Sequence, residues 1–181
     1  MFKIFQKKHN SGNTTLASGE KASKTCELVE LYGNLDELNS FVGWCAEALH
    51  SDNYQDAEHR FLLKQLYVIQ KQLFTLGQQL TEDKIIVTEQ HIKQLEKVIE
   101  DISNKLPSIN SFVLPGGGEA ATRLHIARAV CRRAERSAFR AHEKKHKNAD
   151  IVGAYLNRLS DWFFVAARFS AFVCSVEEVT V

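Results

Sequence analysis

The sequence predicts an all-α protein, a bundle of five helices preceded by an extended N-terminal loop. Only two of its 181 residues are proline. Both of them, Pro107 and Pro115, fall in one segment, so long stretches of the chain are free to form helix. Between about residues 27 and 175, apolar side chains recur at helical spacing in five separate runs. Five amphipathic helices joined by short loops are typical of a bundle.

The first 25 residues differ in composition from the remainder of the chain. Asn, Ser, Gly, Thr and Lys dominate there, apart from a short FKIF start with β-like character. We therefore expect residues 1–25 to form an extended loop or arm. We expect residues 26–181 to form the helical bundle of the same single domain, because a chain of this length suffices for one core and is short for two.

The first predicted helix runs from Glu27 to about His50, with Asp36 and Asn39 on its more polar side. A second covers roughly residues 55–80, and a third begins after Thr88, whose hydroxyl suits an N-cap. The fourth and fifth predicted helices, which carry the polar motifs discussed below, span about 119–146 and 149–175.

Composition excludes several classes of function. The formal net charge is +1 with 25% charged residues, which gives no global field for nucleic acid. No run of 18 uncharged apolar residues occurs, and the N-terminus lacks the long apolar segment of a signal peptide. The four cysteines form no CxxC pair, and three lie inside apolar helical patterns, which indicates reduced core residues. We expect a cytoplasmic protein without nucleic-acid or membrane partners.

The fourth predicted helix carries arginine at every fourth position. Arg128, Arg132, Arg136 and Arg140 share one helical face, and only Glu135 lies near them in sequence. Each pair of neighbouring guanidinium groups, four residues apart on the helix, destabilises it by a few tenths of a kcal/mol through repulsion. The pattern therefore favours an anionic partner, either a phosphate-bearing ligand or carboxylates of a neighbour. A solvated stripe with scattered surface ion pairs is the alternative.

Three further features flank this helix. Asn157 and Asp161 share a face of the fifth predicted helix, although Asn157 alone would be a cap or a satisfied polar group. Gly116 to Gly118 could cradle phosphate, but the Lys and Ser/Thr of a P-loop do not follow, so a tight turn before a helix is the simpler account. An aromatic residue before such a turn, here Phe112, is usually a core anchor.

Taken together, four blocks of sequence resemble the PduO-type ATP:cob(I)alamin adenosyltransferases. They lie in the family's order and span nearly the whole chain: VELYGNLDELNS at 29–40, FVLPGGG at 112–118, HIARAVCRRAER at 125–136 and AYLNRLSDWFFVAAR at 154–168. The resemblance implies a five-helix bundle that assembles as a homotrimer. It also implies an enzyme that transfers the 5′-deoxyadenosyl group of ATP, bound with Mg²⁺, to the cobalt of reduced cobalamin and releases triphosphate.

The resemblance also implies roles for particular residues. Arg132 would act on the triphosphate, while Arg128 would pair with Asp36 of the neighbouring subunit to shape the catalytic site. Phe112 would pack beneath the corrin and displace its lower ligand, and Glu135 would help to hold Mg²⁺, unless it simply pairs with an adjacent arginine. The implied ATP-binding residues are Lys7, Lys8, Asn10, Gly12, Thr14, Thr15, Lys24, Arg132, Glu135, Arg136 and Asn157. Implied partners are a flavin-type reductase and an adenosylcobalamin-dependent client enzyme.

The N-terminal loop departs from the family's pattern. Relatives have a Thr-Gly-Asp-x-Gly loop around ATP, whereas this chain has Lys8, His9 and Asn10 at the first three positions. Loss of the glycine matters if that backbone must approach phosphate closely, and Asn removes a charge that Asp would supply. These departures favour an alternative function, a non-catalytic paralogue that binds corrinoid or nucleotide and carries or senses the cofactor.

Overall fold

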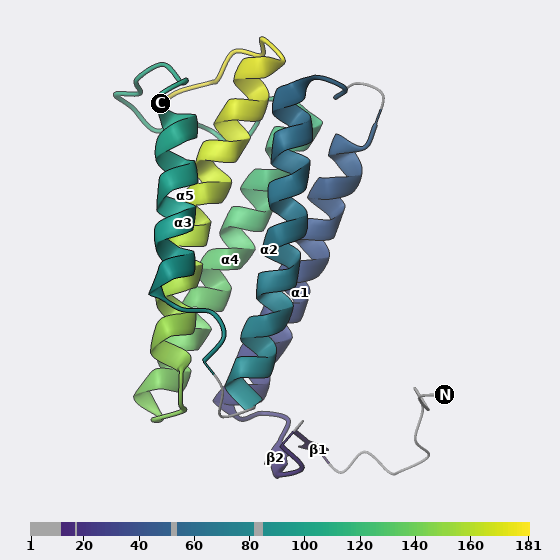
Figure 1. Ribbon diagram of the computed structural model, residues 1–181, viewed down its shortest axis with the longest axis vertical. Coiled ribbons are helices and arrows are strands. Elements are labelled where there is room, and N and C mark those ends of the chain that lie inside the picture. The colour runs from purple at the N-terminus through teal and green to yellow at the C-terminus, as the bar shows by residue number, and fades with distance from the viewer. Residues whose placement is uncertain (1–11, 17, 52–53, 82–84) are drawn as a thin grey trace.

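The computed structural model describes residues 12–16, 18–51, 54–81 and 85–181. Five long helices run side by side along the long axis of the molecule (Figure 1). This confirms the predicted helical class. The helices are α1 Glu27–Leu49, α2 Ala57–Thr81, α3 Glu89–Ser103, α4 Glu119–Glu143 and α5 Ala149–Val173.

Two helices are followed by a residue in the left-handed conformation, and both helices end earlier than predicted. After α4, His146 N–H donates to the carbonyl of Ala141 at 3.1 Å, and Lys145 between them has a φ of 62°. After α5, Val176 N–H donates to the carbonyl of Ala171 at 2.9 Å, with Ser175 at a φ of 55°. Both ends are Schellman caps without the usual glycine. Periodicity alone does not reveal such caps, so α4 was predicted three residues too long.

The N-terminal arm contains a small hairpin where the sequence predicted only an extended loop. Strands β1 Asn13–Thr15 and β2 Lys21–Ser23 pair antiparallel, with Thr14 opposite Ala22. Strands of three residues are too short for period-two patterning to stand out. The hairpin lies at the end of the bundle at which α1 begins (Figure 1).

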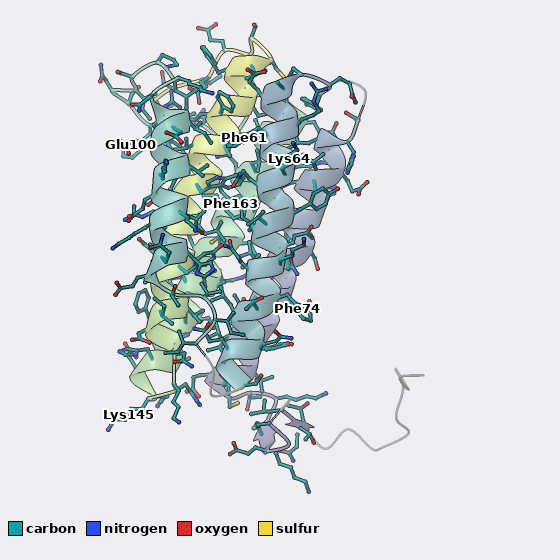
Figure 2. The ribbon with its side chains drawn as sticks, in the orientation of Figure 1. Phe61, Lys64, Phe74, Glu100, Lys145 and Phe163 are labelled. Carbon is teal, nitrogen blue, oxygen red and sulfur yellow. The ribbon has the colours of Figure 1, made fainter. Side chains whose placement is uncertain are left out.

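The core lies between α4 and α5, packed against the other helices. α4 contributes small buried residues, among them Ala127, Ala134 and Ala138, so the backbone of α5 can approach closely. α5 contributes large ones, and Figure 2 shows Phe163 lying among the helices while Phe74 on α2 points outward. Full burial of one such aromatic side chain contributes about 1.5–3 kcal/mol.

The cysteine prediction holds in part. Cys45 and Cys131 are buried in the helical core, and all four cysteines are free thiols. Cys174 is exposed, which corrects its assignment to the core: it lies one residue beyond the end of α5, where the chain turns off the bundle. Within the described ranges, no helix is both long enough and apolar enough to cross a membrane.

Candidate functional site

The predicted arginine face exists on α4. Arg132, Arg136 and Arg140 are exposed, and Nη1 of Arg136 donates to the main-chain carbonyl of Arg132 at 3.0 Å. Within the described part of the chain, none of these side chains, nor that of Arg128, forms an ion pair. The alternative of scattered surface ion pairs therefore does not describe this face. Its positive charge stays available for an anion from outside the chain.

Arg128 is the most constrained member of the row. It is half-buried, and its Nε is buried without a hydrogen-bond partner among the described residues. Burial, followed by the charge of Arg132, lowers the pKa of Arg128. A desolvated charge without a partner is costly, so this position suits an anion or acceptor from beyond the described residues.

Arg128 borders a cavity of about 500 Å³ between α4, α5 and the loop before α4. The other lining residues are Ile109, Asn110, Ser111, Phe112, Val113 and Phe164. Phe112 is 85% exposed, which excludes the interpretation of this aromatic as a core anchor. An exposed aromatic at the rim of a cavity suits contact with a large flat ligand.

The glycines after Phe112 form a tight turn that leads into α4. Gly117 and Gly118 have φ values of 92° and 95°, which L side chains rarely adopt. A Cβ at Gly117 would lie 2.6 Å from the Cβ of Ala171 on α5. The turn is therefore pressed against α5, in agreement with the simpler account drawn from the sequence.

Glu135 and Asn157 meet between α4 and α5. Nδ2 of Asn157 donates to Oε1 of Glu135 at 2.9 Å. Within the described residues Glu135 pairs with no arginine, so the ion-pair alternative does not hold. Asp161, predicted on the same face as Asn157, instead accepts from Arg158 at 2.8 Å.

Asp36 lies on α1, exposed, at the edge of a shallow groove between α1 and α2. Among the described residues it forms no ion pair, whereas its neighbour Glu37 pairs with Arg133. A single chain therefore does not bring Asp36 and Arg128 together. The groove is otherwise lined by Tyr32, Leu35, Asn39, Leu73, Phe74 and Gly77.

The described part of the N-terminal arm surrounds a second cavity. The main-chain carbonyl of Gly12, where φ is 76°, accepts from the N–H of Lys24 at 2.8 Å. Thr14 and Thr15 line a cavity of about 230 Å³ together with Leu16, Leu28, Val29, Tyr32 and Thr81. Lys7, Lys8 and Asn10, expected to contact ATP, lie outside the described residues.

Sequence reasoning missed a buried ionic group next to the Phe112 loop. Arg168 is 7% exposed, and its guanidinium binds the carboxylate of Glu178 at 3.0 Å. His125 is also buried near this end, with Nδ1 unpartnered among the described residues. The signal for Arg168 was its place in the apolar run WFFVAARFSAF, because an arginine in such a run requires a buried partner.

Comparisons with known proteins agree on one family. A model of the cobalamin adenosyltransferase family matches residues 4–170. A corrinoid adenosyltransferase from Bacillus subtilis (strain 168) is 40% identical over 171 residues, which cover 92% of this chain and 85% of that protein. The corrinoid adenosyltransferase PduO from Salmonella typhimurium is 36% identical over 172 residues, which span 91% of this chain and 48% of the relative.

A solved structure supports the same assignment. It is a phenylalanine-to-histidine variant of a PduO-type ATP:corrinoid adenosyltransferase from Lactobacillus reuteri, complexed with cobalamin and ATP. The TM-score is 0.88 at 31% sequence identity, and the match covers 99% of this chain and 96% of the other.

Proposed function

The chain belongs to the cobalamin adenosyltransferase family, and on this premise we propose that the arginine face of α4, the Glu135–Asn157 pair and the Phe112 loop hold its two substrates. It is an enzyme that transfers the 5′-deoxyadenosyl group of ATP to the cobalt of a corrinoid. The observation that carries the site assignment is the row of arginines on α4 that meets no carboxylate among the described residues.

Arg132 and Arg136 bind the triphosphate of ATP in this proposal. Co(I) attacks C5′ of the ribose, the C5′–O bond breaks, and triphosphate leaves with the electron pair. The metal is itself the nucleophile, so the protein needs to position the substrates and stabilise the leaving charge rather than supply a general base. Planar guanidinium groups that cannot lose their charge suit that role.

Glu135 fits a magnesium ion held jointly with ATP. Among the described residues no cluster of three or more His, Cys, Asp or Glu could hold a metal. Mg²⁺, however, is commonly bound by one or two carboxylates plus substrate phosphates. One carboxylate oxygen of Glu135 accepts from Asn157, and the other would bind the ion. The ion would neutralise charge on the leaving triphosphate.

Phe112 lies beneath the corrin in this proposal, at the rim of the 500 Å³ cavity. There it takes the space of the lower axial ligand of cobalt. Loss of that donor favours the reduction of Co(II) to Co(I), by one electron from a reductase of the flavin type. An adenosylcobalamin-dependent enzyme would then receive the product.

A homotrimer completes the site. Asp36 of one subunit would pair with Arg128 of the next, which supplies the anion that Arg128 lacks among the described residues. The groove beside Asp36 carries Phe74, 62% exposed, and Tyr32, 45% exposed, apolar surface of the kind that subunit interfaces cover. Because the two partners come from different faces, the contact is head-to-tail, and in the proposed trimer three such contacts form a closed ring.

The decisive experiment is an anaerobic assay of the purified protein with cob(I)alamin and MgATP, followed by visible absorbance. We expect adenosylcobalamin and triphosphate to form in equal amounts. The protein must also bind MgATP when cobalamin is absent. Binding of corrinoid without any turnover would instead favour the non-catalytic paralogue suggested by Lys8, His9 and Asn10.

A further inference from the structure

The C-terminal segment, residues 174–181, pairs with the loop that carries Phe112. The N–H of Leu114 donates to the carbonyl of Val179 at 2.8 Å, and the N–H of Val181 donates to the carbonyl of Phe112 at 3.0 Å. Between these bonds, Val113 and Thr180 form an antiparallel bridge. Figure 1 shows the C-terminus beside this loop. The main chain of Phe112 is thus held directly by the end of the protein.

One buried arginine anchors this segment. Nε of Arg168 donates to both carboxylate oxygens of Glu178, each at 3.0 Å, and Nη2 donates to the carbonyl of Pro107 at 3.0 Å. The Arg168 side chain is 7% exposed and that of Glu178 is 19% exposed. Removal of one partner of such a desolvated pair leaves a buried charge, so breaking this contact costs much more than breaking a surface ion pair.

We propose that Arg168 and Glu178 are positioning residues that hold Phe112 in the place it needs beneath the corrin. Arg168 fixes the start of the loop through Pro107, and Glu178 fixes the C-terminal segment that pairs with the end of the loop. Phe112 is 85% exposed, so few contacts of its own side chain can hold it. Its position is set mainly by its main chain, and the main chain is tied to one guanidinium at both ends.

The inference rests on the proposed role of Phe112 and predicts a selective defect. A loosened loop would let the lower base of cob(II)alamin return to cobalt, which slows the one-electron reduction by a reductase or a chemical reductant. Formation of the Co–C5′ bond from a corrinoid already reduced to Co(I) would be unaffected. A corrinoid without a lower base, such as cobinamide, would not need Phe112 at all.

The test compares Glu178→Gln with Glu177→Gln. Glu177 is an exposed carboxylate on the same segment, so the control removes the same charge without touching Arg168. With cob(II)alamin and a chemical reductant, turnover of Glu178→Gln should fall by about tenfold to a hundredfold, the size expected for a misplaced positioning group. With cob(II)inamide it should stay within about twofold of the parent, and Glu177→Gln should stay within about twofold with both.

Two further variants reach the loop by independent routes. Arg168→Lys keeps the charge but lacks the fork that joins Glu178 to Pro107. Val181→Pro removes the N–H that donates to Phe112 and substitutes neither member of the ion pair. Both variants should lose turnover with cob(II)alamin and keep it with cob(II)inamide. In Glu178→Gln, hydrogen exchange at the amides of Leu114 and Val181 should also accelerate, which reports the pairing without any turnover.

Phe112→Ala separates failure of this inference from failure of the proposed function. If Phe112→Ala shows no selective loss with cobalamin, the role of Phe112 is wrong and the inference falls with it. If Phe112→Ala is selective while folded Glu178→Gln and Val181→Pro are not, the positioning role alone is overturned. Equal losses with cobalamin and cobinamide in these variants would mean a general structural role and would also overturn it.

Discussion

At the scale of single residues, the arginines differ in whether a carboxylate of the same chain meets them. Arg123, Arg133, Arg158 and Arg168 each meet a carboxylate within the chain. The arginines assigned to the site do not, among the described residues. The positive charge of this row is therefore available to a triphosphate and to a neighbouring subunit, as the proposal requires.

Arg132→Ala tests the phosphate assignment. The substitution removes charge-assisted hydrogen bonds to the leaving group, and we expect it to raise the barrier by about 2–4 kcal/mol, as for loss of one preorganised donor. Arg140→Ala is the matched control, since Arg140 is exposed on the same face of α4 but has no assigned contact. The measurement is kcat/KM for MgATP with cob(I)alamin. Turnover of Arg132→Ala within about twofold of the parent would contradict the assignment.

His125 should make stability depend on pH. Burial, followed by the charge of Arg128, lowers the pKa of His125 to about 4, against a partial opposing effect of Glu178. As pH falls below about 6.5, the unfolded chain binds a proton here that the folded chain does not bind until about pH 4, so the free energy of unfolding falls, by at most about 3 kcal/mol. Urea unfolding from about pH 7 to pH 5 should give a shallower pH dependence for His125→Gln than for the parent.

The exposed His142 offers the comparison for this pH effect. His142→Gln removes another histidine from α4, at its exposed C-terminal end, and should leave the pH dependence of the parent in place. If the free energy of unfolding depends on pH equally in His125→Gln and in the parent, His125 does not cause the effect.

At the scale of elements, the turn before α4 links helix packing to the site. Gly117 combines a positive φ with close approach to Ala171, and the same turn follows directly on the Phe112 loop. Helix start, packing on α5 and placement of Phe112 therefore depend on one short segment. A shift there would change the rim of the cavity as well as stability.

Gly117→Ala should destabilise the protein by about 2–4 kcal/mol, the sum of left-handed strain and overpacking against α5. Gly116→Ala is the control, because a Cβ at Gly116 would come no closer than 3.9 Å to its nearest neighbour, the carbonyl of Leu114. Urea unfolding midpoints of the two variants give the comparison. Equal midpoints would show that the turn relaxes without cost.

At the scale of the whole molecule, the proposed homotrimer combines residues of two copies in one site. Asp36 lies at the groove between α1 and α2, and Arg128 lies at the cavity beside α4 and α5. A head-to-tail ring would bring these faces together. The solution mass of the assembly should then be three times the 20.5 kDa of the chain.

Charge reversal tests that pairing. Asp36→Arg and Arg128→Asp should each weaken assembly, while the double variant should recover part of the loss, with a coupling energy of about 0.5–3 kcal/mol. Sedimentation of the parent and the three variants over a range of concentrations measures this. Additive losses in the double variant, or a parent that stays at the mass of one chain, would count against the proposed interface.

The local features of the protein follow from neighbouring positions in its sequence. Apolar spacing places each helix within a few residues, because the period of 3.6 is a property of neighbouring positions. The same periodicity places Arg128, Arg132 and Arg136 on one face. The family's order of motifs lies at this level too, because the resemblance supplied a role for Phe112 that composition and spacing did not. The exposure of Phe112 came only from the structure.

The contacts between helices and loops that lie far apart in the sequence could be seen only in the tertiary structure. The bond between Asn157 and Glu135 spans 22 positions, and that between Arg168 and Pro107 spans 61. The C-terminal segment carries no sequence pattern from which its pairing with the Phe112 loop could be predicted, because a single bridge between two short segments has no period. Such contacts depend on how α4 packs against α5 and on where the chain turns away after α5 ends at Val173. Both are properties of the packed bundle rather than of any one stretch of sequence.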